Sequence, residues 1–455
     1  MRWQASILAE NGGAIHVHND TAVPQATALR RFGELAPSFA LVALLTALLA
    51  PRATPGLLFI FGLPIVALAL PRGIGPELPR APLLAALGVL AGYLFLNALW
   101  AVDPLQGLGR ALLFVTIVAS VTAVAMAVVR LESDEARRLR LGLLIAIGVG
   151  AVFLAIETPL GQPIRRAAIS LLPFLRPAPK HIVVSNGWVD AIHLYTLNRN
   201  LAVLNLVLWA AMLMLRASLP TGRMRLAAVA LLAMSALAMF TSEHETSMIS
   251  IVAGCLVFLG MLVAAPVMRA LVLAGWIAAT MFVVPLAAIS HDAGLHRAEW
   301  MPGTARNRIV LWSVTARKMT ESPIFGIGIG STKPLDEEAA PTAKTQPGDT
   351  YPQRTGRHSH NIFMQTWYEL GAVGAILLLV TGVIGLRGLA RLPADDQPYA
   401  YASFVAASVI ASFTWGMWQP WFMAAFGIWA TVLAIALDAA RRARAEQPPE
   451  PLSRS

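Results

Sequence analysis

The sequence predicts an all-α polytopic membrane protein with about 12 transmembrane helices and two long periplasmic loops containing short helices. Composition is the first observation behind this prediction. Of the 455 residues, 57% are hydrophobic and only 13% are charged, which is too little polar surface to cover a soluble globule of this size. The second is that runs of roughly 20 apolar residues, the length that crosses a bilayer as a helix, recur along the chain. The third is that short loops bearing arginine separate these runs.

The apolar runs define the expected helices in order. They are residues 36–50, 55–71, 82–100, 111–129, 141–156, 198–215, 226–242, 246–264, 270–290, 361–386, 399–417 and 421–438. The first two runs are short, so a tilted pair or one re-entrant pair stays an alternative for them.

An even number of spans places both termini on one side of the membrane, and the arginines indicate which side. With a cytoplasmic N-terminus, nineteen arginines fall in cytoplasmic segments, and short loops on the other side hold only Arg52 and Arg110. This bias predicts a multi-pass protein of the bacterial inner membrane with both termini cytoplasmic. The net charge of +10 then reflects topology and contacts with membrane lipids, and we expect no nucleic-acid partner.

The predicted organisation has seven segments. They are a cytoplasmic N-terminal segment at 1–34, transmembrane helices 1–5 at 35–156, a periplasmic loop at 157–197, transmembrane helices 6–9 at 198–290, a large periplasmic loop at 291–360, transmembrane helices 10–12 at 361–440 and a cytoplasmic tail at 441–455. We expect the tail to be disordered and the first segment to lack a cleaved signal peptide, because it holds no uninterrupted apolar stretch. Cys255 is the single cysteine, which excludes an intramolecular disulfide.

The two long loops differ in composition from the rest of the chain, since they hold all four lysines and six of the nine histidines. Loops longer than roughly 15 residues are usually functional or disordered. In the second loop, Thr304 to Met319 is predicted to be a helix with Arg308 and Trp312 one turn apart. A glycine-rich turn follows at 326–330, and the polar stretch Thr332 to Thr355 is expected to be mobile.

The strongest candidate for chemistry is the run Arg357-His358-Ser359-His360-Asn361, where the second long loop enters the tenth span. Two histidines here fit a metal pair, an acid–base site or simple interfacial residues. We place His360 in the first helical turn, where the positive end of the helix dipole disfavours imidazolium. A neutral imidazole can accept a proton, as a general base must. The nearby carboxylates lie in a segment without inferable geometry, so we expect no metal and no cofactor.

Two arginines are candidates for binding an anion. Arg199 lies at the start of the sixth span, where a guanidinium is costly unless an anionic group pairs with it. The alternative to such an anion is that the side chain snorkels to the lipid headgroups. Arg308 is either a surface residue of the loop helix or one arm of a phosphate clamp. Guanidinium groups suit phosphate oxygens, and two of them can neutralise a diphosphate without a metal ion.

Other polar and aromatic residues are assigned structural roles. Glu369 lies nine residues after His360, about 13 Å along a helix, and is expected to pair within the bundle. The run Ser242 to Glu245 is expected to cap a helix. We assign three tryptophans to the interfacial aromatic belt. They are Trp415, Trp418 and Trp421.

Around His360 the sequence resembles the O-antigen ligases of lipopolysaccharide biosynthesis, within the O-antigen ligase and polymerase superfamily. That family pattern is a His followed by Asn, Ser or Gln, nine residues and Gly-x-x-Gly. It is met by His360-Asn361, by 362–370 and by Gly371-Ala372-Val373-Gly374. The segments 198–202 and 323–328 and the Arg308–Trp312 pair agree with the superfamily. The Ser-Arg-Gly-like residues that many members carry are missing at Ser242–Glu245.

The resemblance implies a glycosyltransferase, namely a metal-independent, inverting O-antigen ligase with a periplasmic active site. Its donor would be O-antigen on undecaprenyl diphosphate and its acceptor a sugar hydroxyl of lipid A-core. It implies that His360 takes the acceptor proton and that Arg199 and Arg308 hold the diphosphate and stabilise its charge. We expect Arg357, His358 and Asn361 to contribute to substrate binding.

Three alternatives stay open. An O-antigen polymerase or a protein O-oligosaccharyltransferase would use the same donor class with another acceptor. The non-enzyme alternative is a flippase or transporter of lipid-linked glycan. Such a protein needs binding groups near the bilayer midplane, whereas the candidate residues here gather at one face.

Overall fold

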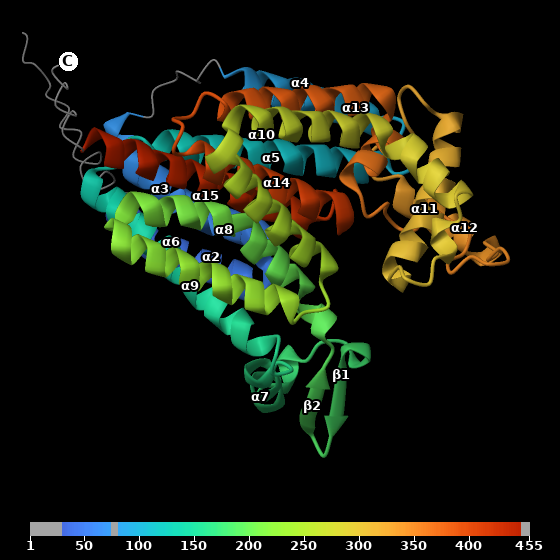
Figure 1. The fold of residues 1–455 in the computed structure, drawn as a ribbon, viewed down its shortest axis with the longest axis horizontal. Helices are drawn as coiled ribbons and strands as arrows, with labels where there is room; N and C mark the ends of the chain where they lie inside the picture. The colour runs from blue at the N-terminus through green and yellow to red at the C-terminus, as the bar shows by residue number, and fades with distance from the viewer. Residues whose placement is uncertain (1–29, 74–80, 447–455) are drawn as a thin grey trace, which may run out of the picture.

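The computed structural model describes residues 30–73 and 81–446, which form a bundle of long helices with two appendages (Figure 1). The helices of the bundle are α2 (Ala36–Leu49), α3 (Thr54–Ala69), α4 (Pro82–Ala98), α5 (Pro104–Val128), α6 (Ser133–Glu157), α8 (Asn198–Ser218), α9 (Thr221–Phe240), α10 (Glu245–Asp292), α13 (Ile362–Leu389), α14 (Gln397–Phe413) and α15 (Pro420–Ala445). The appendages contain α7 (Pro163–Leu171), the strands β1 (Ile182–Ser185) and β2 (Trp188–Ile192), α11 (Gly303–Lys318) and α12 (Thr332–Ala339).

The all-α membrane fold is confirmed. In the described ranges, eight helices are long and apolar enough to cross a membrane, and α2 and α4 are shorter apolar helices. Two predicted spans belong to α10, whose 48 residues are interrupted by non-helical backbone at Ala264. Large apolar side chains such as Leu262 and Val263 stay exposed on this helix, which suits a lipid solvent. The number of membrane crossings stays a prediction.

Local signals explain several helix boundaries. The side chain of Asp103 caps α5 by accepting a hydrogen bond of 3.0 Å from the Gln106 amide. Glu132 and Glu135 form a reciprocal capping box at the start of α6. Both carboxylates also pair with Arg72, which lies in the short helix after α3. These contacts fix the turns at one end of the bundle.

The centre of the bundle is α8, in which every residue from Asn200 to Leu215 is buried against α2, α6, α14 and α15. Polar side chains of α8 form hydrogen bonds with main-chain carbonyls near the ends of neighbouring helices. Asn200 donates to the Leu48 and Leu49 carbonyls at 2.7 and 2.9 Å, and Asn205 donates to the Ser247 carbonyl at 3.0 Å. The first turn of α8, which carries Arg199, is therefore fixed against the end of α2.

The first long loop contains a β-hairpin that was not predicted. Its strands are antiparallel, with Ile182 opposite Ile192, and the turn residues Asn186 and Gly187 both have positive φ, 50° and 83°. An Asn-Gly pair is a strong signal for such a two-residue turn, so the sequence did contain the information.

The second long loop is more ordered than expected. The predicted helix at Thr304–Met319 is confirmed as α11, but the prediction of a mobile stretch at 332–355 is wrong for residues 332–342, which are helical. That stretch forms α12, and the buried carboxylate of Asp336 pairs with Arg354. The predicted disordered tail is also wrong as far as Ala445, where α15 ends, and residues 447–455 lie outside the described ranges.

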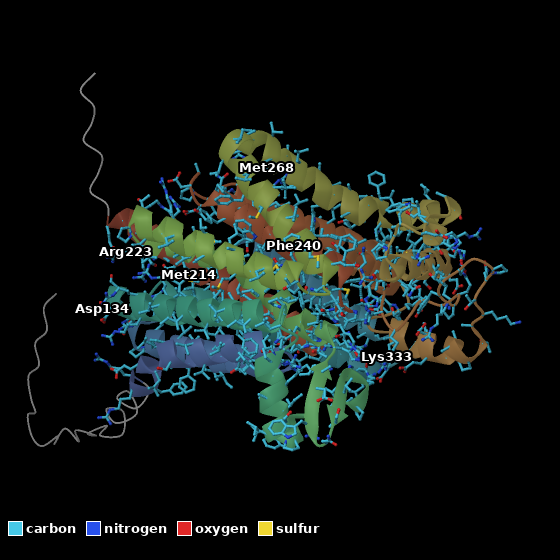
Figure 2. All side chains as sticks on the ribbon, turned by 60° about the horizontal axis from the view of Figure 1, so that its bottom comes forward. Asp134, Met214, Arg223, Phe240, Met268 and Lys333 are labelled. Atoms are coloured by element: carbon cyan, nitrogen blue, oxygen red, sulfur yellow. The ribbon has the colours of Figure 1, made fainter. Side chains whose placement is uncertain are left out.

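Both appendages lie at the end of the bundle opposite the C-terminal end of α15 (Figure 1). Figure 2 shows Asp134 and Arg223 at one end of the molecule and Lys333 of the second loop at the other. The two long loops therefore lie at one end of the molecule and the arginine-rich short loops at the other, as the arginine distribution predicts. The compartment that each end faces stays a prediction.

The Gly-x-x-Gly segment coincides with a break in α13. Gly371 has φ 64° and ψ −165°, a conformation restricted essentially to glycine. The segment 323–330 lies against this break, where the Ile327 and Gly328 amides donate to the Tyr368 and Glu369 carbonyls at 3.1 and 3.0 Å. A Cβ on Gly371 would lie 2.3 Å from the Ile324 carbonyl oxygen. The two family-like segments therefore form one structural unit.

Candidate active site

His360 lies just before α13, and its backbone is unusual. The helix begins at Ile362, with Asn361 as its N-cap accepting a hydrogen bond of 3.0 Å from the Met364 amide. The placement of His360 in the first helical turn is therefore wrong by two residues, because the Asn361 side chain starts the helix after it. His360 has φ 53°, a left-handed conformation that non-glycine residues seldom adopt and that often marks functional sites.

The surroundings of His360 fix its tautomer and its charge. Nδ1 is hydrogen-bonded to the main-chain carbonyl of Thr414, which can only accept, so Nδ1 carries the proton and Nε2 keeps its lone pair. The pKa of His360 is lowered to about 4, mainly by burial and also by the positive charge of Arg308, while the hydrogen bond to Thr414 opposes the shift. The imidazole is thus neutral at pH 7, but burial and Arg308 are the causes, not the helix dipole alone.

His358 is a second neutral imidazole beside His360. The two ring centroids are 4.0 Å apart with an interplanar angle of 63°. The pKa of His358 is lowered to about 3, mainly by burial and to a smaller extent by neighbouring cationic groups such as Arg357 and Arg308. Arg357 is exposed and forms an ion pair of 2.7 Å with Glu337 of α12.

Arg308 reaches this group because α11 is tied to the histidine loop. The indole of Trp312, one turn after Arg308, donates to the Ser359 carbonyl at 2.6 Å. The charge of Arg308 lowers the pKa of His244, His358 and His360, as expected for a cation held close to all three. The spacing of Arg308 and Trp312 therefore places a guanidinium and an anchor on the same helix face.

Arg199 contacts the connection between α14 and α15. Its guanidinium carbon is 5.8 Å from the ring centroid of Trp415 and 5.3 Å from that of Trp421, within cation–π distance. Together with Arg52 and His181 it lines a pocket of about 410 Å³. Tryptophan faces hold this cation, so the contact accounts for its position inside the protein.

The connection at 414–416 links the predicted site residues. Thr414 binds His360 through its carbonyl, Trp415 contacts Arg199, and Gly416 packs so closely on His358 that a Cβ there would lie 2.8 Å from the His358 Cβ. His360, His358 and Arg199 thus all contact this connection. Arg199 and His358 nevertheless line two different pockets.

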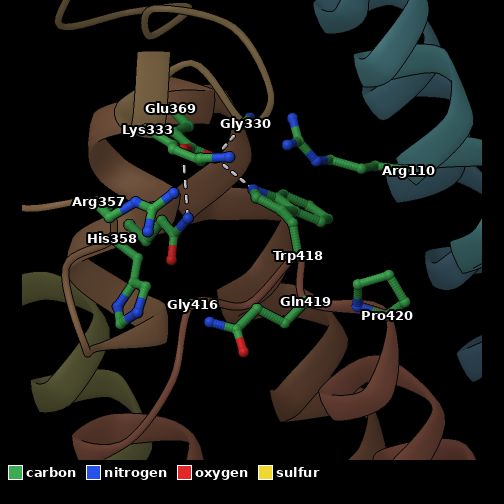
Figure 3. Close-up of a pocket in the computed structure, with 11 residues that line it drawn as sticks. Arg110, Gly330, Lys333, Arg357, His358, Glu369, Gly416, Trp418, Gln419 and Pro420 are labelled. Atoms are coloured by element: carbon green, nitrogen blue, oxygen red, sulfur yellow. Dashed lines mark hydrogen bonds between the residues drawn. The ribbon is translucent and has the colours of Figure 1, made fainter. Parts of the chain in front are cut away.

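The second pocket, of about 360 Å³, is shown in Figure 3. Three cations line it, Arg110 from α5, Lys333 from α12 and Arg357 from the histidine loop, and His358 lies beside them. Sequence reasoning missed Arg110 and Lys333 because they are 223 positions apart and neither belongs to a recognisable motif. This concentration of positive charge suits an anionic ligand.

Glu369 lines this pocket, and its carboxylate accepts hydrogen bonds from donors of the protein itself (Figure 3). Its carboxylate accepts hydrogen bonds from the Gly330 amide at 2.8 Å, the Thr332 amide at 3.1 Å, the Gln365 side chain at 3.2 Å and the Trp418 indole. Pairing within the bundle is confirmed. The carboxylate holds the glycine-rich turn against α13, so its role is to position the pocket wall.

The interfacial assignment is wrong for Trp418 and Trp421, and it stays a prediction for the half-buried Trp415. Trp418 and Trp421 are buried, at 8% and 7% exposure, because their indoles meet Glu369 and Arg199 inside the protein. His244, which begins α10, also has a position that sequence reasoning missed. Its ring lies 5.4 Å from that of Trp415, and its Nδ1 is 2.6 Å from the Ser247 hydroxyl. The start of α10 thereby joins the aromatic side chains beside Arg199.

An apolar pocket of about 650 Å³ opens next to the histidine loop. Its walls come from the second half of α10, from Phe363 and from Phe413, and Asn361 and Trp312 reach into it. The pocket therefore lies beside Asn361 and Trp312, which both adjoin the histidine loop.

Comparison with known proteins gives a consistent result. Residues 229–379 match the family model described as O-antigen ligase. A candidate polysaccharide ligase of Rickettsia felis is 24% identical over 267 residues, which are 58% of this chain and 64% of that protein. Candidate polysaccharide ligases of Rickettsia bellii and Rickettsia conorii are 24% and 29% identical over 53% and 29% of this chain and 58% and 31% of their own lengths. The chain thus spans less than two thirds of each relative.

Proposed function

We propose that this chain, whose residues 229–379 match the family model described as O-antigen ligase, transfers O-antigen from undecaprenyl diphosphate to a sugar hydroxyl of lipid A-core. The reaction is placed at the periplasmic face of the inner membrane, where the histidine loop and both appendages would lie. It is proposed as a single displacement with inversion at the anomeric carbon, without a metal ion.

The observation that carries the proposal is the neutral, oriented imidazole of His360. Its Nδ1–H is held by the Thr414 carbonyl, so Nε2 is available to take the proton of the acceptor hydroxyl. The hydroxyl oxygen then forms the new bond to the anomeric carbon, and the bond from that carbon to the diphosphate oxygen breaks. The diphosphate leaves with the electron pair, so the catalytic work is orientation and charge stabilisation.

The donor is proposed to bind between Arg199 and Arg308. Arg199 contacts Trp415 and the charge of Arg308 acts on His360, and two such guanidinium groups can share the oxygens of a diphosphate and stabilise the charge that develops on it. The apolar pocket beside Phe363 and Phe413 suits the prenyl chain, because it lies next to Asn361 and Trp312 and so ends close to both His360 and Arg308.

The acceptor is proposed to enter the pocket lined by Arg110, Lys333 and Arg357. Lipid A-core is anionic, so its charged groups complement these three cations. His358 lines this pocket and touches the ring of His360, which would bring an acceptor hydroxyl there within reach of the base. Donor and acceptor would then approach the base from two sides.

The test uses purified protein in liposomes with both lipid substrates and EDTA. We expect the wild type to form ligated product and His360→Ala to form none while keeping its thermal unfolding temperature. His193→Ala, an exposed histidine of the hairpin loop, is the matched control and is expected to be fully active. Full activity of His360→Ala would remove the catalytic assignment.

The products distinguish the related activities. A ligase gives glycan attached to lipid A-core, a polymerase gives longer polyprenyl-linked glycan, and a protein O-oligosaccharyltransferase gives glycosylated protein. A flippase moves labelled donor across the liposome without forming any product. For Arg199→Ala and Arg308→Ala we expect a higher KM for the donor with folding retained, and unchanged donor kinetics would favour a headgroup contact for these arginines.

A further inference from the structure

A second cluster of histidines lies at the far end of α10. His291 occupies the last turn of α10, His296 lies in the short helix that follows, and Asp349 comes from the loop segment that leads to His360. The two imidazole rings stack with centroids 4.2 Å apart and an interplanar angle of 9°. The Asp349 carboxylate oxygen is 3.2 Å from His296 Nε2 and 3.8 Å from His291 Nε2.

These three residues form a compact donor set. One potential ligand atom from each lies within 4.8 Å of the other two. His296 is 2% exposed, and the Asp349 side chain is 1% exposed. In the described part of the chain, the buried His291 Nε2 and His296 Nδ1 have no hydrogen-bond partner. Leaving a buried nitrogen without a partner is unfavourable, and His291 Nε2, which faces the Asp349 carboxylate, would gain a partner from a bound ion.

We propose that His291, His296 and Asp349 bind one divalent transition-metal ion such as Zn²⁺. Two imidazole nitrogens and one carboxylate oxygen are a typical three-residue zinc set, in which water completes a tetrahedron. The site lies outside the proposed catalytic residues, so the ion is structural. It would link the end of α10 to a loop segment 58 positions away, eleven residues before His360.

The neighbouring Arg297 indicates which nitrogen faces the ion. Its Nε donates to His296 Nε2 at 3.0 Å, which requires a lone pair on that nitrogen. The guanidinium therefore lies where an ion bound to His296 Nε2 would lie, and this nitrogen is 3.2 Å from Asp349. Arg297 also contacts the Pro347 carbonyl at 3.4 Å, so it already tethers the same loop segment that the ion would hold. Metal binding would displace this cation and replace a weak tether with coordinate bonds.

The experiment titrates Zn²⁺ into the EDTA-treated, detergent-purified full chain by calorimetry. We expect one ion per chain, a Kd at least about 100-fold weaker in both His296→Ala and Asp349→Asn, and a metal-dependent rise in thermal unfolding temperature only where binding is kept. Asp292→Asn is the matched control, because this adjacent carboxylate is exposed and its contact is with His291 Nδ1. It should bind like the wild type.

Arg297→Ala gives an independent check that does not remove a ligand. Removing the competing guanidinium should tighten Zn²⁺ binding. The proposal is overturned if the wild type does not bind Zn²⁺, if Asp349→Asn binds like the wild type, or if Arg297→Ala weakens binding. The experiment measures Zn²⁺ binding and its effect on thermal unfolding, so its outcome is independent of whether the chain transfers glycan.

Discussion

The pH dependence of transfer tests the proposed base directly. The reactive form of His360 is the neutral imidazole, and its pKa is lowered to about 4. The rate should therefore be full above this value and fall as the pH drops through it. At pH 7, about three units higher, roughly one chain in a thousand carries the proton, so protonation of His360 costs almost no activity at neutral pH.

Arg308→Gln perturbs this pKa in a known direction. Burial is the largest cause of the lowering, and the charge of Arg308 is the second. Removing that charge should raise the pKa while burial keeps it below the ordinary value of about 6.5. The acid limb of kcat/KM should move to higher pH by less than about 2.5 units, each unit corresponding to about 1.4 kcal/mol.

The assay measures initial rates of transfer in liposomes across the acid range and compares profiles normalised to their plateaus, because Arg308→Gln also weakens donor use. Arg317→Gln is the control, since Arg317 is an exposed residue of the same helix whose guanidinium bonds Gln353 at 2.6 Å. An acid limb centred near 6.5 in the wild type, or identical limbs in the wild type and Arg308→Gln, would refute the reasoning.

Three further predictions address the fold and the acceptor pocket. Gly371→Ala should lower the free energy of unfolding by at least about 1–3 kcal/mol in thermal unfolding, whereas Gly385→Ala in open space on the same helix should not. Arg110→Ala should raise the KM for lipid A-core and leave that for the donor unchanged. The unfolding temperature should fall from pH 6.5 to 4, because His244 and His358, with folded pKa values of about 3, take up protons only on unfolding.

The sequence was sufficient wherever a local pattern determines the structure. Apolar runs predicted the helices, and the Arg308–Trp312 spacing predicted α11. The histidine segment was found because His360 and the Gly-x-x-Gly residues are close in sequence. Local reasoning failed at the start of α13, where the capping side chain of Asn361 moves the helix boundary past His360.

Contacts between distant segments could not be predicted. Arg110 and Lys333 meet beside Trp418 only because α5, α12 and the start of α15 are brought together by the bundle. The low pKa of His360 likewise depends on burial and on Arg308, two consequences of packing that no residue within its own segment encodes. The two buried tryptophans were misplaced for the same reason, since their partners Glu369 and Arg199 lie far away in the chain.

These contacts give the family-like glycines a physical role. Gly371 opens α13 so that the segment 323–330 can form main-chain hydrogen bonds to it, and Glu369 then holds the Gly330 and Thr332 amides. Lys333 follows directly, so the same contacts place one cation of the proposed acceptor pocket. His360 is oriented by a main-chain carbonyl in the same way. Because backbone groups hold both walls of the site, its geometry depends on glycines and carbonyls that need not touch substrate.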